Sequence, residues 1–188
     1  MIQLLSIFFL SGLLATTTHA QYGATAALPD GRPADFPTPP KTEKSLFFIQ
    51  RNKNKHTIVY DAILEKDGSY VSSKPIDAYW LRYYDTVKRA ELTWLQRTFA
   101  FGYNAKKDAT KEGYWITLTA YNDRKIHLEK NAGNKPIATM NINGKYCRLE
   151  NIWVFADESG SWPKVLHVDL HGVDMVTGKP EVERINNK

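Results

Sequence analysis

Two runs of apolar and β-branched residues frame a short polar segment between Leu46 and Leu64. The first run begins Leu-Phe-Phe-Ile and continues to Arg51, the second begins Thr-Ile-Val-Tyr, and the five residues between them, Asn52 to His56, are all polar. Apolar runs of this length on either side of a few polar residues are typical of a β-hairpin. The pattern therefore predicts two strands joined by a loop at the start of a folded domain.

Strand-like patterns recur along the rest of the chain, separated by Gly, Asn and Asp. The strongest turn signal is Asn143-Gly144, since both positions of a type I′ turn require positive φ. Further strands are predicted over 76–84, 114–121, 125–128, 136–142, 145–156 and 164–174, with a last strand ending near Ile185. This succession favours a mainly β fold, an antiparallel β-sandwich or barrel-like domain of about eight or nine strands with one packed α-helix.

The predicted helix covers residues 85–99, with a polar cap at its first or second residue. Leu92, Leu95 and Phe99 follow one another at the spacing of a single helix face. Gly102 is placed to end the helix. We expect this apolar stripe to pack on the sheet as part of the core.

The N-terminal region has the layout of a secretory signal. Residues 2–14 form an uncharged apolar run, and Thr18 and Ala20 place small residues at a cleavage site before Gln21. The run is shorter than the roughly 20 apolar residues that span a bilayer. We therefore expect a signal peptide over 1–20, export to the periplasm or the cell exterior, and no transmembrane segment in the mature chain.

The next segment, residues 21–44, contains five of the nine prolines. It has too few large apolar side chains to offset the entropy of ordering, which predicts a flexible or polyproline-like tether. The part nearest Lys44 can lie against the folded domain. The remaining residues, 45–188, suit one β-rich domain with one core.

The chain is moderately basic, with 25 Lys and Arg against 20 Asp and Glu, a net charge of +5 and a pI near 9.2. A modest positive field favours an anionic partner such as an anionic glycan or an envelope lipid, and it also serves simple solubility. No nucleic-acid-binding motif accompanies it, so no nucleic-acid partner is expected. The single Cys147 cannot form an intramolecular disulfide and is predicted to be a small, half-buried hydrophobe.

The best metal candidate is the trio His167, Asp169 and His171, which would share one face of a strand. Neighbouring members would lie roughly 6.6 Å apart and the outer histidines about 13 Å apart. Both histidines therefore cannot reach one zinc ion, whose bonds are about 2 Å long. One histidine with Asp169 could bind a metal helped by a distant His56 or His127, and otherwise the trio is a polar strand face.

No familiar catalytic signature is present elsewhere. The nucleophile elbow Gly-x-Ser-x-Gly, the zinc motif His-Glu-x-x-His, the phosphate-binding loop and the dinucleotide fingerprint are all missing. The sequence therefore predicts no catalytic residue and no cofactor, and it leaves open whether the protein is an enzyme.

Arg82 stands between Trp80 and Tyr84 on one face of a predicted strand. A guanidinium withdrawn from water among aromatic rings needs a partner. We expect it to meet backbone carbonyls or a carboxylate, with Asp61 and Glu91 as the first candidates. The alternative is that Arg82 serves a ligand.

Several short motifs together resemble the family called domain of unknown function 4833, a group of secreted bacterial proteins. They lie at residues 46–54, 59–60, 78–83, 99–103, 120–121, 142–144 and 177–179. The resemblance covers nearly all of residues 45–185. It implies export from a Gram-negative, Bacteroidetes-like cell, and it implies no activity, cofactor or catalytic residue.

Two functions from different classes follow from these observations. The first is a non-catalytic, envelope-associated binding or structural module, and the second is a hydrolase acting on an envelope polymer or lipid, with metal assistance from the histidine trio as one version. Basic, amide and aromatic side chains placed in loops or on aromatic faces are the candidate ligand-binding residues of the first. They are Arg51, Asn52, Asn54, Arg82, Tyr103 and Arg124.

Overall fold

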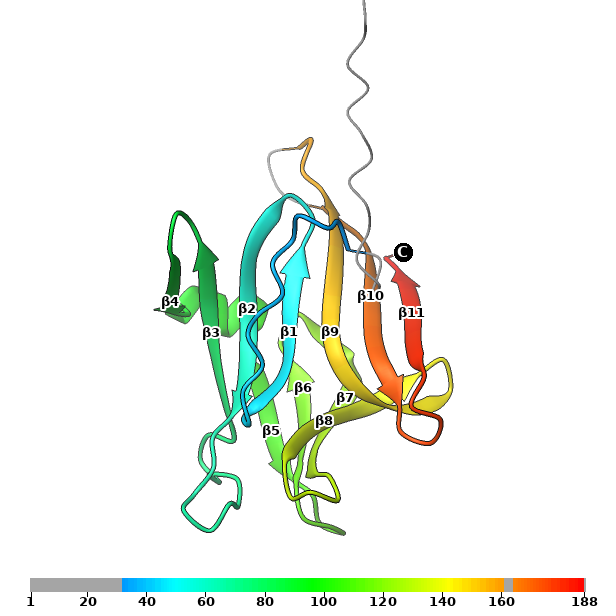
Figure 1. The fold of residues 1–188 in the computed structure, drawn as a ribbon. Coiled ribbons are helices and arrows are strands. Elements are labelled where there is room, and N and C mark those ends of the chain that lie inside the picture. Colours follow the sequence, from blue (N-terminus) through cyan, green and yellow to red (C-terminus); the bar gives the residue numbers. More distant parts are fainter. Residues whose placement is uncertain (1–31, 161–163, 188) are drawn as a thin grey trace, which may run out of the picture.

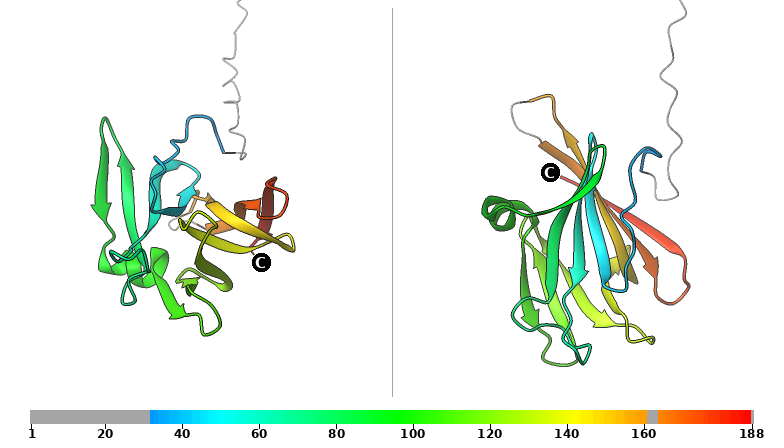
Figure 2. Two further views of the ribbon diagram at one scale, coloured as in Figure 1. Left: turned by 60° about the horizontal axis from the view of Figure 1, so that its bottom comes forward. Right: turned by 60° about the vertical axis from the view of Figure 1, so that its left-hand side comes forward.

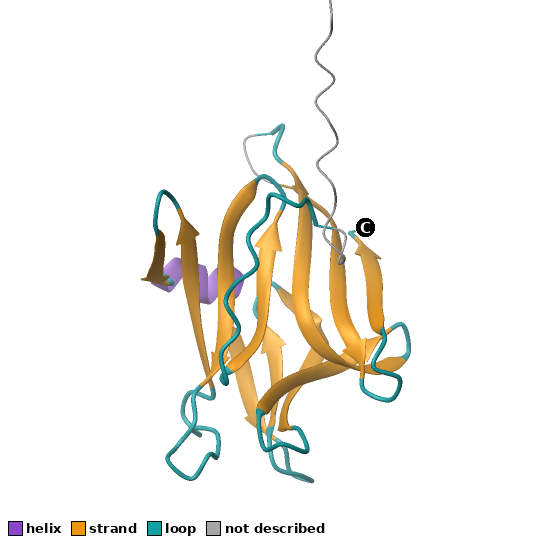
Figure 3. Ribbon diagram, viewed as in Figure 1, coloured by secondary structure: helices purple, strands orange, loops and turns teal. Residues whose placement is uncertain are grey.

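The computed structural model describes residues 32–160 and 164–187 (Figure 1). The predicted signal peptide and the first part of the predicted tether, residues 1–31, lie outside the described residues. Within the described ranges, eleven strands form one sheet accompanied by a short helical segment (Figure 3). No helix in these ranges has the length and apolar character needed to cross a membrane.

The first four strands begin with the predicted hairpin. They are β1 (Ser45–Arg51), β2 (Asn54–Ala62), β3 (Ile76–Tyr83) and β4 (Val87–Glu91), and each pairs antiparallel with the next. The β1–β2 turn is tighter than the predicted polar loop, because Arg51 already pairs with Asn54. Lys53 makes this possible by adopting a positive φ of 61°, which few residues other than glycine do.

The next four strands form an antiparallel meander. They are β5 (Tyr103–Lys107), β6 (Tyr114–Leu118), β7 (Tyr121–Lys130) and β8 (Pro136–Ile142). The predicted turn after β8 is confirmed, because Asn143 and Gly144 have φ values of 52° and 78°. This turn leads directly into the longest strand.

The last three strands are β9 (Lys145–Asp157), β10 (Lys164–Asp174) and β11 (Pro180–Asn186). One edge of β9 pairs along its length with β10, which in turn pairs with β11. The other edge pairs first with β8, antiparallel, and then with β1, parallel. The resulting order is β4-β3-β2-β1-β9-β8-β7-β6-β5, with β10 and β11 attached beside β9.

The change of partner along β9 curls the sheet into a half-barrel (Figure 2). The part made of β1–β4 and the part made of β5–β8 face each other, and the core fills the space between them. The largest buried side chains come from both parts and include Tyr60, Ile76, Ile116 and Leu128. Cys147 is a core residue, as a small hydrophobe should be, but it is fully buried rather than half-buried as predicted.

The mainly β prediction is confirmed, but the finer description needs correction. The sheet is mixed rather than antiparallel, because β1 and β9 run parallel. Eleven strands, rather than eight or nine, are present in the described residues. The two strands that were not predicted, β4 and β5, end the nine-strand path and are exposed along most of their length. Such edge strands carry no alternating apolar face for a sequence pattern to reveal.

The predicted helix over 85–99 is wrong in extent and in orientation. Its first part is the edge strand β4, and only α1 (Trp94–Gln96) and the π-helical turn η1 (Arg97–Phe101) follow. Leu92 is buried, whereas Leu95 and Phe99 are 59% and 67% exposed. The predicted apolar stripe does not form, because Leu92 precedes the first helical residue, Trp94. Leu92, Leu95 and Phe99 therefore share no helix face.

Much of the predicted tether is bound to the sheet. Residues 32–44, which we call the N-terminal strap, run along the face of β1 that points away from the core (Figure 1). Phe36 is buried edge-on against Trp153 of β9, with ring centroids 4.9 Å apart. The prediction that the part nearest Lys44 lies on the domain is therefore confirmed, and among the described residues these contacts reach as far as Arg32.

Candidate functional site

A pocket opens at the point where the two parts of the sheet separate. Arg148 of β9 still pairs with β8, and Asn151 already pairs with β1, so Leu149 and Glu150 lie between the two partners. The gap has a volume of about 270 Å³. We call it the junction pocket; it is lined by the strap residues 39–43, the starts of β1 and β8, and the middle of β9.

The junction pocket combines an apolar floor with a charged rim. Phe47 and Leu149 belong to the floor and are buried. Three cationic and two anionic side chains surround it and form ion pairs at the rim. The pairs are Lys41–Glu150 at 3.4 Å, Arg148–Glu150 at 2.9 Å and Lys135–Glu43 at 2.9 Å.

The strap wall of the pocket is held by Arg32, which is only 3% exposed. Its guanidinium donates to Gln50 Oε1 and to Thr38 Oγ1, the latter at 3.1 Å, and lies 5.1 Å from the centre of the Phe48 ring. Gln50 Nε2 in turn donates to the carbonyl of Pro37 at 2.7 Å. The strap is thus tied to β1 by a buried polar network, which fixes the outer wall of the pocket.

A second cluster, which we call the His127 network, lies on the outer face of β7 beside the pocket. The ring of His127 is buried, with Nε2 3.1 Å from Asp108 Oδ2 and Nδ1 3.4 Å from Glu129 Oε2. Trp115 covers the imidazole, with ring centroids 4.5 Å apart. Thr139, the cross-strand neighbour of His127, pairs in register with Arg148 of the pocket rim.

Glu129 connects the buried histidine to the surface. Its Oε1 accepts hydrogen bonds from the Tyr146 hydroxyl and, at 2.9 Å, from Thr139 Oγ1, while Lys111 Nζ lies 3.2 Å from Oε2. Tyr146 is 45% exposed. The contacts form a continuous chain from a surface hydroxyl through a carboxylate to a buried imidazole.

The surroundings shift the pKa values of His127, Glu129 and Tyr146 in different directions. Burial lowers the pKa of His127, and the charge of Lys111 lowers it further, against the opposing effect of Glu129 and Asp108. Burial alone would raise the pKa of Glu129, but hydrogen bonds from Tyr146 and Thr139 bring it below the ordinary value. Burial and Glu129 raise the pKa of Tyr146 to about 12. At neutral pH the network therefore holds a neutral histidine, an ionised carboxylate and a protonated phenol.

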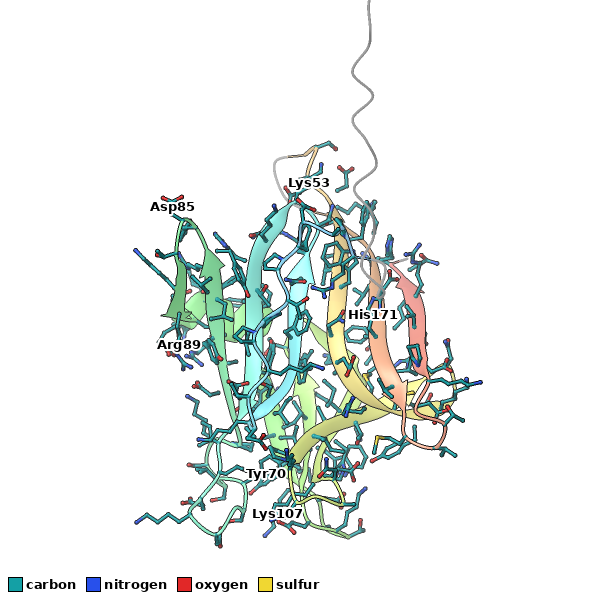
Figure 4. The ribbon with its side chains drawn as sticks, viewed as in Figure 1. Lys53, Tyr70, Asp85, Arg89, Lys107 and His171 are labelled. Carbon is teal, nitrogen blue, oxygen red and sulfur yellow. The ribbon has the colours of Figure 1, made fainter. Side chains whose placement is uncertain are left out.

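Three of the predicted ligand-binding residues serve the β1–β2 turn. Arg51 pairs with Glu158 at 3.1 Å. The Asn52 side chain makes two hydrogen bonds with the backbone of Ala156, at 2.9 and 2.7 Å, and Asn54 Oδ1 accepts from a backbone N–H two residues along. Arg51 and Asn52 join the turn to the end of β9, near Lys53 in Figure 4.

The other three lie on three different strands, Tyr103 on β5, Arg124 on β7 and Arg82 on β3. The Tyr103 hydroxyl bonds to the backbone of Ile76, and Arg124 forms a two-pronged pair with Glu183. Arg82 is half-buried rather than withdrawn from water. Its two candidate partners are bound elsewhere, since Asp61 accepts from Tyr79 and Glu91 pairs with Arg89 and Arg97. The six residues therefore do not all meet in one place, because Tyr103 and Arg124 lie on other strands than the β1–β2 turn.

The histidine trio on β10 is also divided among other contacts. Asp169 forms a two-pronged pair with Arg184, with both distances 2.8 Å. His167 stacks on Phe155 with ring centroids 4.8 Å apart, and its Nε2 is 4.0 Å from Asp169 Oδ2. His171, labelled on β10 in Figure 4, is buried. In the described part of the chain, no group of three or more His, Cys, Asp or Glu side chains is arranged to hold a metal ion.

Sequence reasoning did not identify the junction pocket or the His127 network. Asp108 and Lys111 lie in the loop between β5 and β6, and their partners His127 and Glu129 lie on β7, with no motif linking them. The only signal in the sequence is the alternation along β7. His127 and Glu129 share one face of the strand, and the core residues Ile126 and Leu128 share the other. That signal predicts a polar face but not the residues that meet it.

Comparison with protein families agrees with the resemblance seen in the sequence. The family model Domain of unknown function (DUF4833) matches residues 47–184, which span all but the first and last residues of the sheet. No curated protein and no solved structure matches the chain significantly. Because the family model covers most of the chain, this protein belongs to the DUF4833 family.

Proposed function

We propose that this protein is an exported, non-catalytic binding module of the cell envelope, and that its junction pocket holds the end of an anionic glycan. The observation that carries the proposal is the pocket itself. Its volume of about 270 Å³ is close to the lower end of small-molecule sites, about 300 Å³. An apolar floor with a few polar groups at the rim is the usual composition of such sites.

The charges at the rim favour an acidic ligand. Three cations, Lys41, Lys135 and Arg148, face two carboxylates, Glu43 and Glu150. Their ion pairs are exposed to solvent, with Lys41 71% and Arg148 42% exposed, so each pair contributes little to stability. A ligand carboxylate can therefore replace a protein carboxylate at low cost, and the planar fork of Arg148 suits that role.

We expect Arg148→Ala to weaken the binding of acidic oligosaccharides. The loss of one hydrogen-bonded charged contact corresponds to roughly 10- to 100-fold in affinity. Isothermal titration calorimetry of the purified protein with oligogalacturonates, and with neutral galacto-oligosaccharides of the same length, measures both affinity and charge preference. Lys125→Ala removes an exposed lysine outside the pocket and is the matched control.

Two results would contradict the proposal. One is equal affinity for the acidic and neutral oligosaccharides, which would show that the basic side chains of the rim do not select an acidic ligand. The other is an equal loss of affinity in the Arg148→Ala and Lys125→Ala variants, which would indicate a general charge effect rather than a site.

The His127 network favours a second candidate function, hydrolysis of an envelope polymer or lipid. A neutral histidine between two carboxylates is a suitable proton acceptor, and Glu129 links it to the exposed hydroxyl of Tyr146. Because His127 is buried beneath Trp115, a substrate would meet the network at Tyr146.

For this second function we expect Glu129→Gln to reduce turnover at least 100-fold, since it breaks the connection between the surface and the histidine. Release of reducing ends from wall polymers and of fatty acid from phospholipids measures the activity. Lys125→Ala is again the control. If the wild-type protein hydrolyses neither substrate, the second candidate function is wrong, and the binding proposal is unaffected.

A further inference from the structure

The helical segment formed by α1 and η1 exposes three large apolar side chains, while Phe101 at its end packs against the core. Trp94, Leu95 and Phe99 are 71%, 59% and 67% exposed. The rings of Trp94 and Phe99 lie edge to face with centroids 6.2 Å apart, so they form one surface. Contiguous exposed apolar side chains of this size on a folded protein indicate an interaction surface.

Polar side chains of the same segment and Phe101 at its end hold it to the protein. Phe101 lies against Trp80 with ring centroids 5.3 Å apart, and its carbonyl accepts a hydrogen bond from the Tyr60 hydroxyl at 2.9 Å. Gln96 closes a capping box with Thr93, and its Oε1 accepts from Trp80 Nε1 at 3.2 Å. Arg97 Nε donates to the carbonyl of Leu92 at 3.2 Å, and its guanidinium pairs with Glu91 at 2.7 Å. The apolar side chains are thus presented by a fixed scaffold rather than by a loose loop.

A pair of basic side chains lies on the neighbouring part of the sheet. Arg82 of β3 and Lys88 of β4 are directly opposite in register, two residues from Trp80, on the same face as the helical segment. Among the described residues, neither basic side chain has an ion-pairing partner. Like charges that face each other across two strands are unfavourable without an external partner.

The charge balance around the segment is positive. Between residues 80 and 101 there are four basic residues and two acidic ones, Asp85 and Glu91. Glu91 is already paired with Arg89 and Arg97, and Asp85 lies at the tip of the β3–β4 hairpin (Figure 4). This surface therefore has unpaired positive charge next to protruding aromatic side chains.

We propose that this surface, which we call the helix patch (Trp94, Leu95 and Phe99 with Arg82 and Lys88), docks the protein onto an anionic lipid bilayer. Aromatic side chains, Trp above all, settle at the boundary between headgroups and acyl chains. Basic side chains beside them attract anionic headgroups. The segment projects from the side of the sheet (Figure 2), so its side chains can enter a bilayer without the complementary groove that a protein partner would need.

Docking at the helix patch is independent of the glycan proposal, because none of the five patch residues lines the junction pocket. Co-sedimentation of the purified protein with vesicles of phosphatidylethanolamine and phosphatidylglycerol, and separately of phosphatidylcholine alone, tests it. We expect binding to the anionic vesicles that is at least tenfold tighter than to the neutral ones. Salt should weaken it, since each basic side chain contributes about fivefold near a charged surface.

Two sets of variants separate the apolar and basic parts of the patch. Trp94→Ala combined with Phe99→Ala should reduce vesicle binding at least tenfold, because both large apolar groups are lost. Leu95→Glu, which adds a negative charge to the same surface, should do the same. Arg82→Ala with Lys88→Ala should remove most of the preference for anionic vesicles and much of the salt dependence. Because these side chains are exposed or half-buried, circular dichroism and the thermal midpoint should stay close to wild type.

The matched control replaces exposed apolar residues elsewhere, Met175→Ala with Val176→Ala, which should leave vesicle binding unchanged. Equal sedimentation of the patch and control variants would overturn the proposal. So would a wild-type protein that ignores vesicles but forms a dimer in analytical ultracentrifugation that Trp94→Ala with Phe99→Ala abolishes. That outcome would assign the patch to a second copy of the chain.

Discussion

Replacing Gly113 with alanine should lower the free energy of unfolding by about 3 kcal/mol, at the upper end of the usual range for single substitutions. Gly113 has a φ of 132°, a conformation that is strained for any residue with a side chain. A Cβ at this position would also lie 2.1 Å from the carbonyl oxygen of Leu128 and 3.1 Å from Nε2 of His127. The backbone or the buried imidazole must therefore move.

Urea unfolding monitored by tryptophan fluorescence measures this loss. Gly144→Ala is the matched control, because Gly144 also has a positive φ, 78°, but its Cβ would meet nothing within 4 Å. In the Gly144→Ala variant, the free energy of unfolding should fall only by the cost of holding an alanine at positive φ, about 1 kcal/mol. Similar losses for the two variants would show that close approach to the His127 network is not what requires glycine at position 113.

Replacing Arg32 with alanine should cost about 2–3 kcal/mol of stability and release the N-terminal strap. The substitution removes a buried guanidinium whose hydrogen bonds are of the charged, stronger kind. It also leaves Oε1 of Gln50, a side chain that is 2% exposed, without its donor. Arg32→Lys should recover only part of the loss, since an ammonium cannot reproduce the fork that reaches Gln50 and Thr38 together.

Denaturant unfolding and limited proteolysis test the two consequences separately. We expect the variant to be cleaved within residues 33–44 at protease concentrations that leave the wild-type strap intact. Lys41→Ala, a change at a strap side chain that is 71% exposed, should alter stability by less than about 0.5 kcal/mol. A strap that stays resistant in the Arg32→Ala variant would mean that its other contacts, such as Phe36–Trp153 and Gln50–Pro37, hold it without Arg32.

If the strap is released, the junction pocket loses its outer wall, because residues 39–43 line it. Acidic oligosaccharides should then bind the Arg32→Ala variant more weakly, although Arg32 does not line the pocket. Vesicle binding should be unaffected, because the helix patch lies on other elements. The Arg32 variant therefore helps to distinguish the two binding proposals.

The sequence by itself determined the local pairings of the sheet. Alternation and turn chemistry are properties of neighbouring residues, so the β1–β2 hairpin and the Asn143-Gly144 turn were predicted correctly. The strands at 136–142 and 164–174 have the predicted bounds for the same reason. Membership of the DUF4833 family was also recognised from short motifs, since these do not depend on knowing which strands meet.

The tertiary structure decided which side chains meet. Arg82 was expected to be buried because it stands between Trp80 and Tyr84 on its strand, but its neighbour β4 is an exposed edge strand, so Arg82 stays half-buried. The helical stripe at Leu95 and Phe99 was assigned to the core, although the segment is held by Gln96, Arg97 and Phe101 and turns these two residues outward. Apolar spacing shows that a face exists, but not which side of the molecule it covers.

The candidate sites depend most on long-range pairing. The junction pocket exists because β9 leaves β8 and joins β1, which is about 100 residues away along the chain, and the His127 network joins β7 to the loop before β6. Such contacts are selected by how the whole sheet closes over its core, and no local pattern encodes that closure. The residues that carry the proposed chemistry were therefore visible in the sequence as polar positions, and only the folded sheet brought them together.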